Sequence, residues 1–65
     1  MIDGVKIQLL REGYSMTQKE LGFKVGVSAN MISLLEAEHK TTNFEVMARI
    51  ADTLGVTMDE LRKKL

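Results

Sequence analysis

Short uncharged side chains gather on one face of the segment from residue 29 to residue 36. At about 100° per residue, Ile32 and Leu35 set the inward direction of a helix there. The residues on the outward face are Ala29, Asn30, Ser33 and Leu34, and Ser28 precedes them at the helix start. An asparagine amide can pair with adenine in the DNA major groove, and small apolar groups can contact thymine methyls. We therefore expect this face to read DNA bases, chiefly through Asn30.

No residue pattern in the chain favours catalysis or metal binding. There is no cysteine, His39 is the only histidine, and neither a Gly-rich phosphate loop nor a Gly-x-Ser-x-Gly motif occurs. A domain of 65 residues is also small for a substrate cavity on the order of several hundred cubic ångströms. We expect no enzymatic activity, and neither a cofactor, a metal ion nor a small-molecule ligand.

The charge balance limits how strongly the chain can attract nucleic acid. Nine basic and nine acidic residues give a formal net charge of zero and a pI near 6.6, whereas basic nucleic-acid-binding domains have a pI above about 9. The charges are spread evenly, without a basic tail or an acidic block. DNA binding must therefore depend on where a few charges are placed.

Length and composition predict one small domain, residues 1–65. Hydrophobic residues make up 45% of the chain, which is enough for a packed core, although a chain of this size buries only about 60% of its unfolded surface. No apolar run approaches the roughly 18 residues of a membrane span. The N-terminus also lacks the basic stretch and apolar segment of a signal peptide. We expect a cytoplasmic protein without membrane contact.

Polar caps and apolar periodicity predict an all-α chain. Thr17 and Glu20 form a capping box, in which each side chain satisfies a free backbone amide at a helix start, and Ser28 is a good cap for the next helix. Two further capping boxes begin at Thr42 and Thr57. The predicted helices are 3–12, 18–25, 29–36, 43–54 and 58–64. The stripes expected to face the core include Ile2, Val5 and Leu9 in the first helix and Phe44, Met47, Ile50, Ala51 and Leu54 in the fourth.

The connection between the second and third predicted helices is only Gly26-Val27-Ser28. So short a connection makes the two helices cross steeply, and glycine allows the left-handed backbone that the turn needs. Gly22 leaves room where the third helix approaches the second. The pair therefore forms a helix-turn-helix between Thr17 and Glu36, inside a compact bundle of five helices.

Three stretches of the sequence carry a specific combination of residues. The first stretch is residues 17–36, and its characteristic parts are Thr17-Gln18-Lys19-Glu20-Leu21-Gly22, Gly26-Val27-Ser28 and Ile32-Ser33-Leu34-Leu35-Glu36. The second stretch is residues 44–51, and the third is residues 54–61. This combination resembles the Cro/C1-type helix-turn-helix family of phage repressors and bacterial regulators, over nearly the whole chain. The resemblance implies a lambda-repressor-like fold, a bacterial or phage-encoded protein, and double-stranded DNA as the partner.

The resemblance also implies a division of roles among the polar residues. In this family the glutamine that opens the second helix binds a DNA phosphate, which corresponds to Gln18, and the start of the third helix reads bases. The loop before the fourth helix holds another phosphate. The residues expected against phosphates are Gln18, Lys19, Lys24, Lys40, Thr41, Thr42 and Asn43, and those expected against bases are Ser28, Ala29, Asn30, Ser33 and Leu34. An internal ion pair between Arg11 and Glu36 is implied as well.

Four positions depart from the pattern of the family, and two of them, Ala29 and Leu34, replace polar base-reading residues that are common elsewhere. The family often has glycine where this chain has Glu38, and proline where it has Thr42. Glu38 places a carboxylate beside the expected phosphate site, where it would repel DNA unless it is turned away.

Two functions are compatible with these residues. The first is a sequence-specific DNA-binding transcriptional regulator, a repressor that binds a two-fold operator as a homodimer, because one neutral module makes few phosphate contacts. Its dimer surface is expected around Val56, Met58, Leu61 and Leu65. The alternative is a protein-interaction module of the same fold, of the antitoxin or anti-repressor type, with Phe23 and Leu34 as contacts and weak or no DNA binding.

Overall fold

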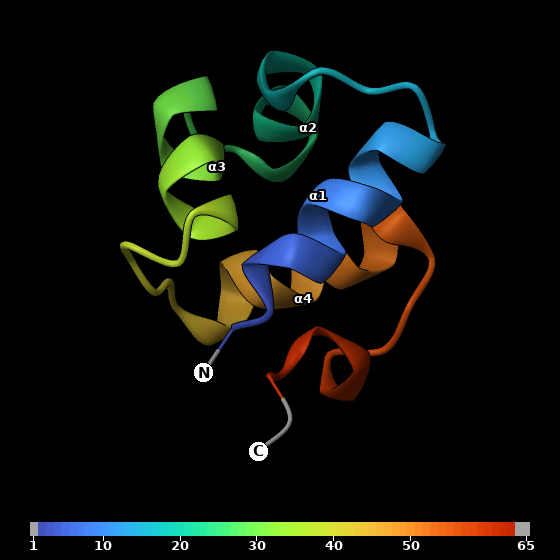
Figure 1. The fold of residues 1–65 in the computed structure, drawn as a ribbon, viewed down its shortest axis with the longest axis vertical. Coiled ribbons are helices and arrows are strands. Elements are labelled where there is room, and N and C mark those ends of the chain that lie inside the picture. Colours follow the sequence, from blue (N-terminus) through green and yellow to red (C-terminus); the bar gives the residue numbers. More distant parts are fainter. Residues whose placement is uncertain (1, 64–65) are drawn as a thin grey trace.

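The computed structural model describes residues 2–63 and, apart from one isolated β-bridge, its regular structure is helical within them (Figure 1). The elements are α1 (Gly4–Gly13), α2 (Gln18–Val25), α3 (Ala29–Glu36), α4 (Phe44–Leu54) and the short 3₁₀ helix η1 (Asp59–Leu61). α2 packs against α3 and α4, and α1 packs against α3, α4 and η1. None of these helices is long and apolar enough to cross a membrane. The all-α prediction is confirmed, with four of the five predicted α-helices present.

The starts of the helices follow the polar caps of the sequence. Thr17 and Glu20 form both halves of the predicted capping box, with the Glu20 amide donating to the Thr17 hydroxyl at 3.0 Å. α4 begins differently from the prediction, since Asn43 and not Thr42 is its cap. The Asn43 side-chain oxygen accepts from the amide of Val46 at 2.9 Å. Asparagine is at least as good an N-cap as threonine, so the start of α4 shifts by one residue.

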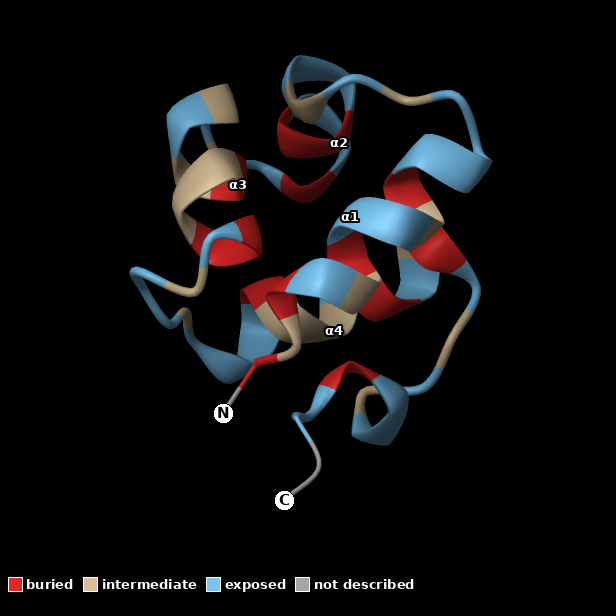
Figure 2. Cartoon of the chain, in the orientation of Figure 1, coloured by how far each residue is buried: buried red, intermediate tan, exposed pale blue. Residues whose placement is uncertain are grey.

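One core receives side chains from all four α-helices and from η1 (Figure 2). Its largest fully buried side chains are Ile7, Leu21, Val25, Ile32, Leu35, Ile50, Leu54 and Leu61. Burying such a side chain contributes roughly 1.5–3 kcal/mol relative to leaving it exposed. Helices of this length are marginal in isolation, so this shared core holds them in their arrangement.

The buried face of α1 differs from the predicted apolar stripe. Val5 and Leu9 are 59% and 63% exposed, whereas Ile7 and Arg11 are buried. Gly4 is buried too, because it lies against the backbone carbonyls at the end of α3. The prediction for Val5 and Leu9 was wrong because it followed hydrophobicity alone, and the inward face of α1 contains a glycine and an arginine.

Phe44 is also outside the core, with 76% of its surface exposed. The sequence placed it in the inward stripe of α4, but Val46, Ile50 and Ala51 form the buried face together with Leu54. Burial of Val46, Ile50, Ala51 and Leu54 therefore leaves the first residue of α4 at the surface.

The fifth α-helix predicted over residues 58–64 is wrong. Only Asp59–Leu61 forms a 3₁₀ turn, after which the chain becomes extended. Ile2 forms an antiparallel bridge with Arg62, and a further backbone hydrogen bond of 2.7 Å joins the same two segments. Pairing with the N-terminal segment therefore replaces helical hydrogen bonds here. The predicted end of the helix, residue 64, lies outside the described residues.

We predict that Gly22→Ala destabilises the protein by about 1–3 kcal/mol. A Cβ at Gly22 would lie 2.6 Å from the carbonyl oxygen of Val27, so the turn between α2 and α3 would have to move. Gly13→Ala is the matched control, because a Cβ there meets nothing within 4 Å. Urea denaturation followed by circular dichroism measures both variants, and equal midpoints would contradict the importance of this close approach.

Candidate nucleic-acid interface

Gly26 makes the turn that joins α2 to α3. It has a left-handed φ of 82°, and the amides of Gly26 and Val27 both donate to the carbonyl of Gly22, at 2.8 and 2.9 Å. The Ser28 hydroxyl then accepts from the Met31 amide at 3.0 Å and starts α3. These local hydrogen bonds satisfy free groups at the end of α2 and the start of α3, and they define the short turn between these two packed helices.

The residues predicted to contact bases all reach the surface to some degree. Ser28 and Asn30 are exposed, and Ala29, Ser33 and Leu34 are half-buried. Between residues 29 and 35 no side chain is charged, so the Asn30 amide is the longest hydrogen-bonding group on this face. A helix with such short outward side chains can bring its backbone close to a groove wall.

A buried ion pair joins α1 to α3 beneath the start of α2. Arg11 Nε donates to Glu36 Oε2 at 2.6 Å, and Arg11 Nη2 donates to Glu36 Oε1 at 3.1 Å. The two side chains are 9% and 4% exposed. The hydrogen bond to the Glu36 carboxylate and the attraction of its charge raise the pKa of Arg11 above its ordinary value, although burial opposes this. The ion pair implied by the family resemblance is therefore present.

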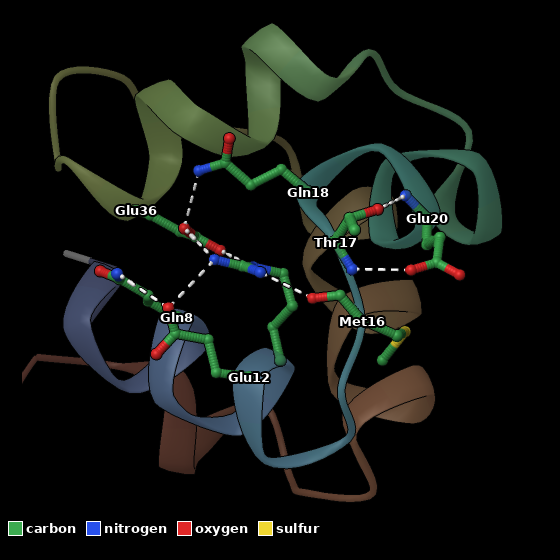
Figure 3. Close-up of polar contacts among 8 residues, drawn as sticks. Gln8, Glu12, Met16, Thr17, Gln18, Glu20 and Glu36 are labelled. Atoms are coloured by element: carbon green, nitrogen blue, oxygen red, sulfur yellow. Dashed lines mark hydrogen bonds and ion pairs between the residues drawn. The ribbon is translucent and has the colours of Figure 1, made fainter.

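The carboxamide of Gln18 completes this cluster (Figure 3). Gln18 Nε2 donates to Glu36 Oε1 at 3.0 Å, across from α2 to α3. Arg11 Nη1 donates to the carbonyl of Met16 at 2.7 Å, just ahead of the cap of α2. Three helices thus meet in one polar network. The contact between Gln18 and Glu36 was not predicted, because residues 18 positions apart in the chain give no local sequence signal.

The three lysines predicted near phosphates are exposed. Lys19 and Lys24 lie on α2, and Lys40 lies in the loop between α3 and α4. Arg49 was not singled out from the sequence, and it reaches from α4 to the end of α2, where Nη1 donates to the Val25 carbonyl at 3.5 Å. A cation is favourable at a helix C-terminus, so Arg49 helps to hold α2 against α4.

The loop from residue 37 to residue 43 carries the remaining predicted phosphate contacts. Lys40, Thr41 and Asn43 are exposed, and Thr42 is half-buried. The Asn43 side-chain oxygen already accepts the hydrogen bond that caps α4. What this end of α4 can offer an anion is therefore the free backbone amides of its first turn together with the hydroxyl groups of the loop.

Glu38 is turned toward the two ends of the chain. Its φ is 61°, a left-handed value that glycine adopts more easily. Its Oε2 accepts from the Gly4 amide at 3.0 Å, and its Oε1 accepts from Lys63 Nζ. The hydrogen bonds from Lys63 and from the Gly4 amide, with the positive charge of Lys63, lower the pKa of Glu38 below its ordinary value. The Glu38 carboxylate is therefore paired with the Lys63 ammonium group and with the amide at the start of α1. It is turned away from the loop, which is the condition under which it would not repel DNA.

The predicted dimer surface is only partly available. Leu61 is fully buried in the core, so its assignment to that surface was wrong. The pairing of the two chain ends turns this residue inward. Val56 and Met58 are half-buried, and Leu65 lies outside the described residues.

An apolar groove of about 470 Å³ lies beside Met58. Ile2, Phe44 and Met47 contribute to its lining, together with the hydroxyl-bearing residues Thr41 and Thr42. The exposed position of Phe44 is thus accounted for, since this side chain forms a wall of the groove instead of part of the core.

A short turn between two packed helices, and short uncharged side chains on the outward face of the second, define a helix-turn-helix protein. The sequence matches the helix-turn-helix family over residues 7–61. The chain belongs to this family, in its Cro/C1-type form, and its family and fold are those of DNA-binding regulators. No curated protein sequence matches the chain.

Several solved structures share the whole fold. The structure of the P22 c2 repressor in complex with a synthetic operator is similar to this chain, with a TM-score of 0.91 and 30% sequence identity. The match covers 97% of this chain and 96% of the P22 c2 chain. The DNA-binding domain of the same repressor in solution matches 94% of this chain over 80% of its own, with 30% identity and a TM-score of 0.85. The clp gene regulator ClgR from Corynebacterium glutamicum matches 89% of this chain over 62% of its own, with 26% identity and a TM-score of 0.81.

We predict that Glu38→Gln makes the thermal midpoint of unfolding depend less on pH in the acidic range. The folded pKa of Glu38 is lowered below its ordinary value of 4.5, so its contribution is complete above about pH 4.5 and is lost as the pH falls through the lower folded pKa. Thermal midpoints of the wild type and the variant, measured between neutral and strongly acidic pH, should therefore converge as the pH decreases.

Lys63→Met is the matched control for this prediction, because it removes the main cause of the shift and leaves the Gly4 hydrogen bond. The Lys63→Met variant should show a pH dependence of its thermal midpoint between those of the wild type and Glu38→Gln. The pKa of Glu20 is also lowered, by its hydrogen bonds with the Thr17 amide and hydroxyl, so some acid sensitivity should remain in both variants. A midpoint difference between wild type and Glu38→Gln that stays constant across this range would contradict the assignment.

Proposed function

We propose that this chain is a sequence-specific transcriptional regulator, a repressor that reads a two-fold operator as a homodimer through α3. The observation that carries the proposal is the lean, uncharged face of α3, which presents the Asn30 amide at the exposed start of the helix. The P22 c2 repressor, which has this fold at 30% identity, is in complex with a synthetic operator. These features support insertion of α3 into the major groove.

Base reading and backbone contact fall to different residues. Asn30 pairs with adenine, Ala29 and Leu34 contact thymine methyls, and the hydroxyls of Ser28 and Ser33 bond to base edges. Phosphate contacts position a protein on the duplex without carrying sequence information themselves. The residues that supply them are Gln18, Lys19, Lys24, Lys40, Thr41, Thr42 and Asn43.

The dimer follows from the charge balance of the chain. A neutral module with few phosphate contacts gains little from counterion release, and two copies one helical turn apart double those contacts. Val56, Met58 and the adjoining apolar groove provide the surface for this pairing, because they are the apolar groups left accessible near the C-terminal segment.

A protein-interaction module of the antitoxin or anti-repressor type is the second candidate, and Phe23 favours it. Phe23 lies on α2 and is 88% exposed, among the side chains of Lys19, Glu20 and Lys24. Aromatic residues are enriched at protein contact surfaces, and DNA reading by α3 does not require Phe23.

A titration followed by amide NMR shifts separates the two candidates. Addition of a mixed-sequence duplex at low salt should move the backbone amides of Gln18, Asn30 and Lys40, because the proposed interface lies on the α2, α3 and loop surfaces. The amide of Glu60 in η1 serves as an internal reference that should stay fixed under these conditions. If no amide moves at any attainable duplex concentration, DNA binding is contradicted and the interaction module is favoured.

We predict opposite patterns for substitutions at Asn30 and Gln18. Asn30→Ala should reduce the preference for one base pair by about 1–3 kcal/mol, while Gln18→Ala should weaken binding to all duplexes alike. Affinities for a duplex selected from a randomised pool, and for its single-base variants, measure both effects. If both substitutions act equally on selected and random duplexes, Asn30 does not read a base.

A further inference from the structure

Glu36 forms the ion pair with Arg11 and also accepts a hydrogen bond from the side chain of Gln18. We propose that Glu36 is a positioning residue, which orients the carboxamide of Gln18 so that one of its N–H groups is presented to a DNA phosphate. This inference rests on the proposed DNA-binding function and names a second requirement for it.

The geometry of the carboxylate fixes where the Gln18 amide must lie. Glu36 Oε1 accepts from Gln18 Nε2 at 3.0 Å and from Arg11 Nη2 at 3.1 Å, while Oε2 accepts from Arg11 Nε at 2.6 Å. The Glu36 side chain is only 4% exposed, so water has little access with which to replace these donors. A terminal amide torsion is otherwise broad, and this acceptor narrows it to one orientation.

The Gln18 amide retains a donor after this contact. A primary amide has two N–H donors and one acceptor oxygen, and the contact with Glu36 uses a single N–H. Figure 3 shows the nitrogen of Gln18 directed at Glu36 and the oxygen directed away from it. Gln18 is also the first residue of α2, and the free backbone amides of a helix start attract anions in their own right.

Arg11 also compensates the negative charge of Glu36. A bare carboxylate behind the phosphate contact would repel DNA, but the Arg11 guanidinium bonds to both carboxylate oxygens and makes the pair neutral. Arg11 further donates to the Met16 carbonyl at 2.7 Å, which lies directly before the cap of α2. The same arginine therefore compensates the charge of Glu36 and holds the start of the helix that carries Gln18.

A double-substitution cycle on a random-sequence duplex tests this role. Gln18→Ala should weaken binding about tenfold in the wild-type background and less than about twofold in the Glu36→Gln background, because the amide is no longer positioned there. Removal of a negative charge by itself would tighten binding to DNA, so the electrostatic effect has the opposite sign. Gln8→Ala is the matched control and should change affinity less than about twofold in either background, since Gln8 lies on α1 and pairs with the exposed Glu12.

A measurement on the wild-type protein avoids dependence on a destabilised variant, since Glu36→Gln leaves Arg11 buried without its partner. ¹⁵N relaxation of the side-chain amides should give Gln18 Nε2 an order parameter near the rigid value of about 0.85, and Gln8 Nε2 a value below about 0.6. Equal mobility of the two side chains would overturn the positioning role. The double variant Arg11→Met, Glu36→Leu supplies a background without an unpaired buried charge if Glu36→Gln does not fold.

The outcomes distinguish this inference from the function on which it rests. Absence of duplex binding by the wild type overturns the proposed function and the positioning role together. Binding that is insensitive to Gln18→Ala overturns the phosphate contact of Gln18. A full tenfold loss on Gln18→Ala in every background overturns only the positioning by Glu36, and loss confined to the background with Glu36 present supports it.

Discussion

The ion pair between Arg11 and Glu36 is the constraint that α1, α3 and the start of α2 share. Breaking a buried pair by removing one partner costs about 3–5 kcal/mol, a large share of the roughly 5–15 kcal/mol that stabilises a domain. The pair fixes α1 against α3, and the bond from Arg11 to the Met16 carbonyl fixes the approach to α2. The polar network therefore positions the helices that carry the surface proposed to contact DNA. On the opposite face of α3, Ile32 and Leu35 are buried in the apolar core.

The two ends of the chain provide a second constraint on the same surface. Ile2 pairs with Arg62, and Glu38 accepts hydrogen bonds from Gly4 and Lys63. The loop that follows α3 is thereby tied to both termini. This closure takes the place of a fifth helix, because it satisfies backbone groups and keeps η1 packed on α1. The loop proposed to contact phosphate is therefore held by the segments at both chain ends as well as by α4.

Local signals in the sequence were sufficient for the starts of α2 and α3 and for the turn between them. The capping box at Thr17 and the left-handed Gly26 act within a few residues, so their structural outcome could be read from the chain. The inward face of α1 could not, because its burial of Arg11 depends on a partner 25 positions away. The same reason hid the bond between Gln18 and Glu36. Glu38 was located correctly in the loop, but its direction depends on Lys63, which only the folded chain brings near.

The zero net charge of the chain gives a misleading picture of the proposed interface. Several carboxylates are already engaged, with Glu20 in a capping box, Glu36 on Arg11 and Glu38 on Lys63. The lysines proposed to meet phosphates are exposed, and none of the ion pairs found within residues 2–63 involves them. Local placement of charge, and not its sum, determines the field that a duplex meets. Phosphate contacts carry no sequence information, so under the proposed function discrimination between operators comes from the short side chains of α3.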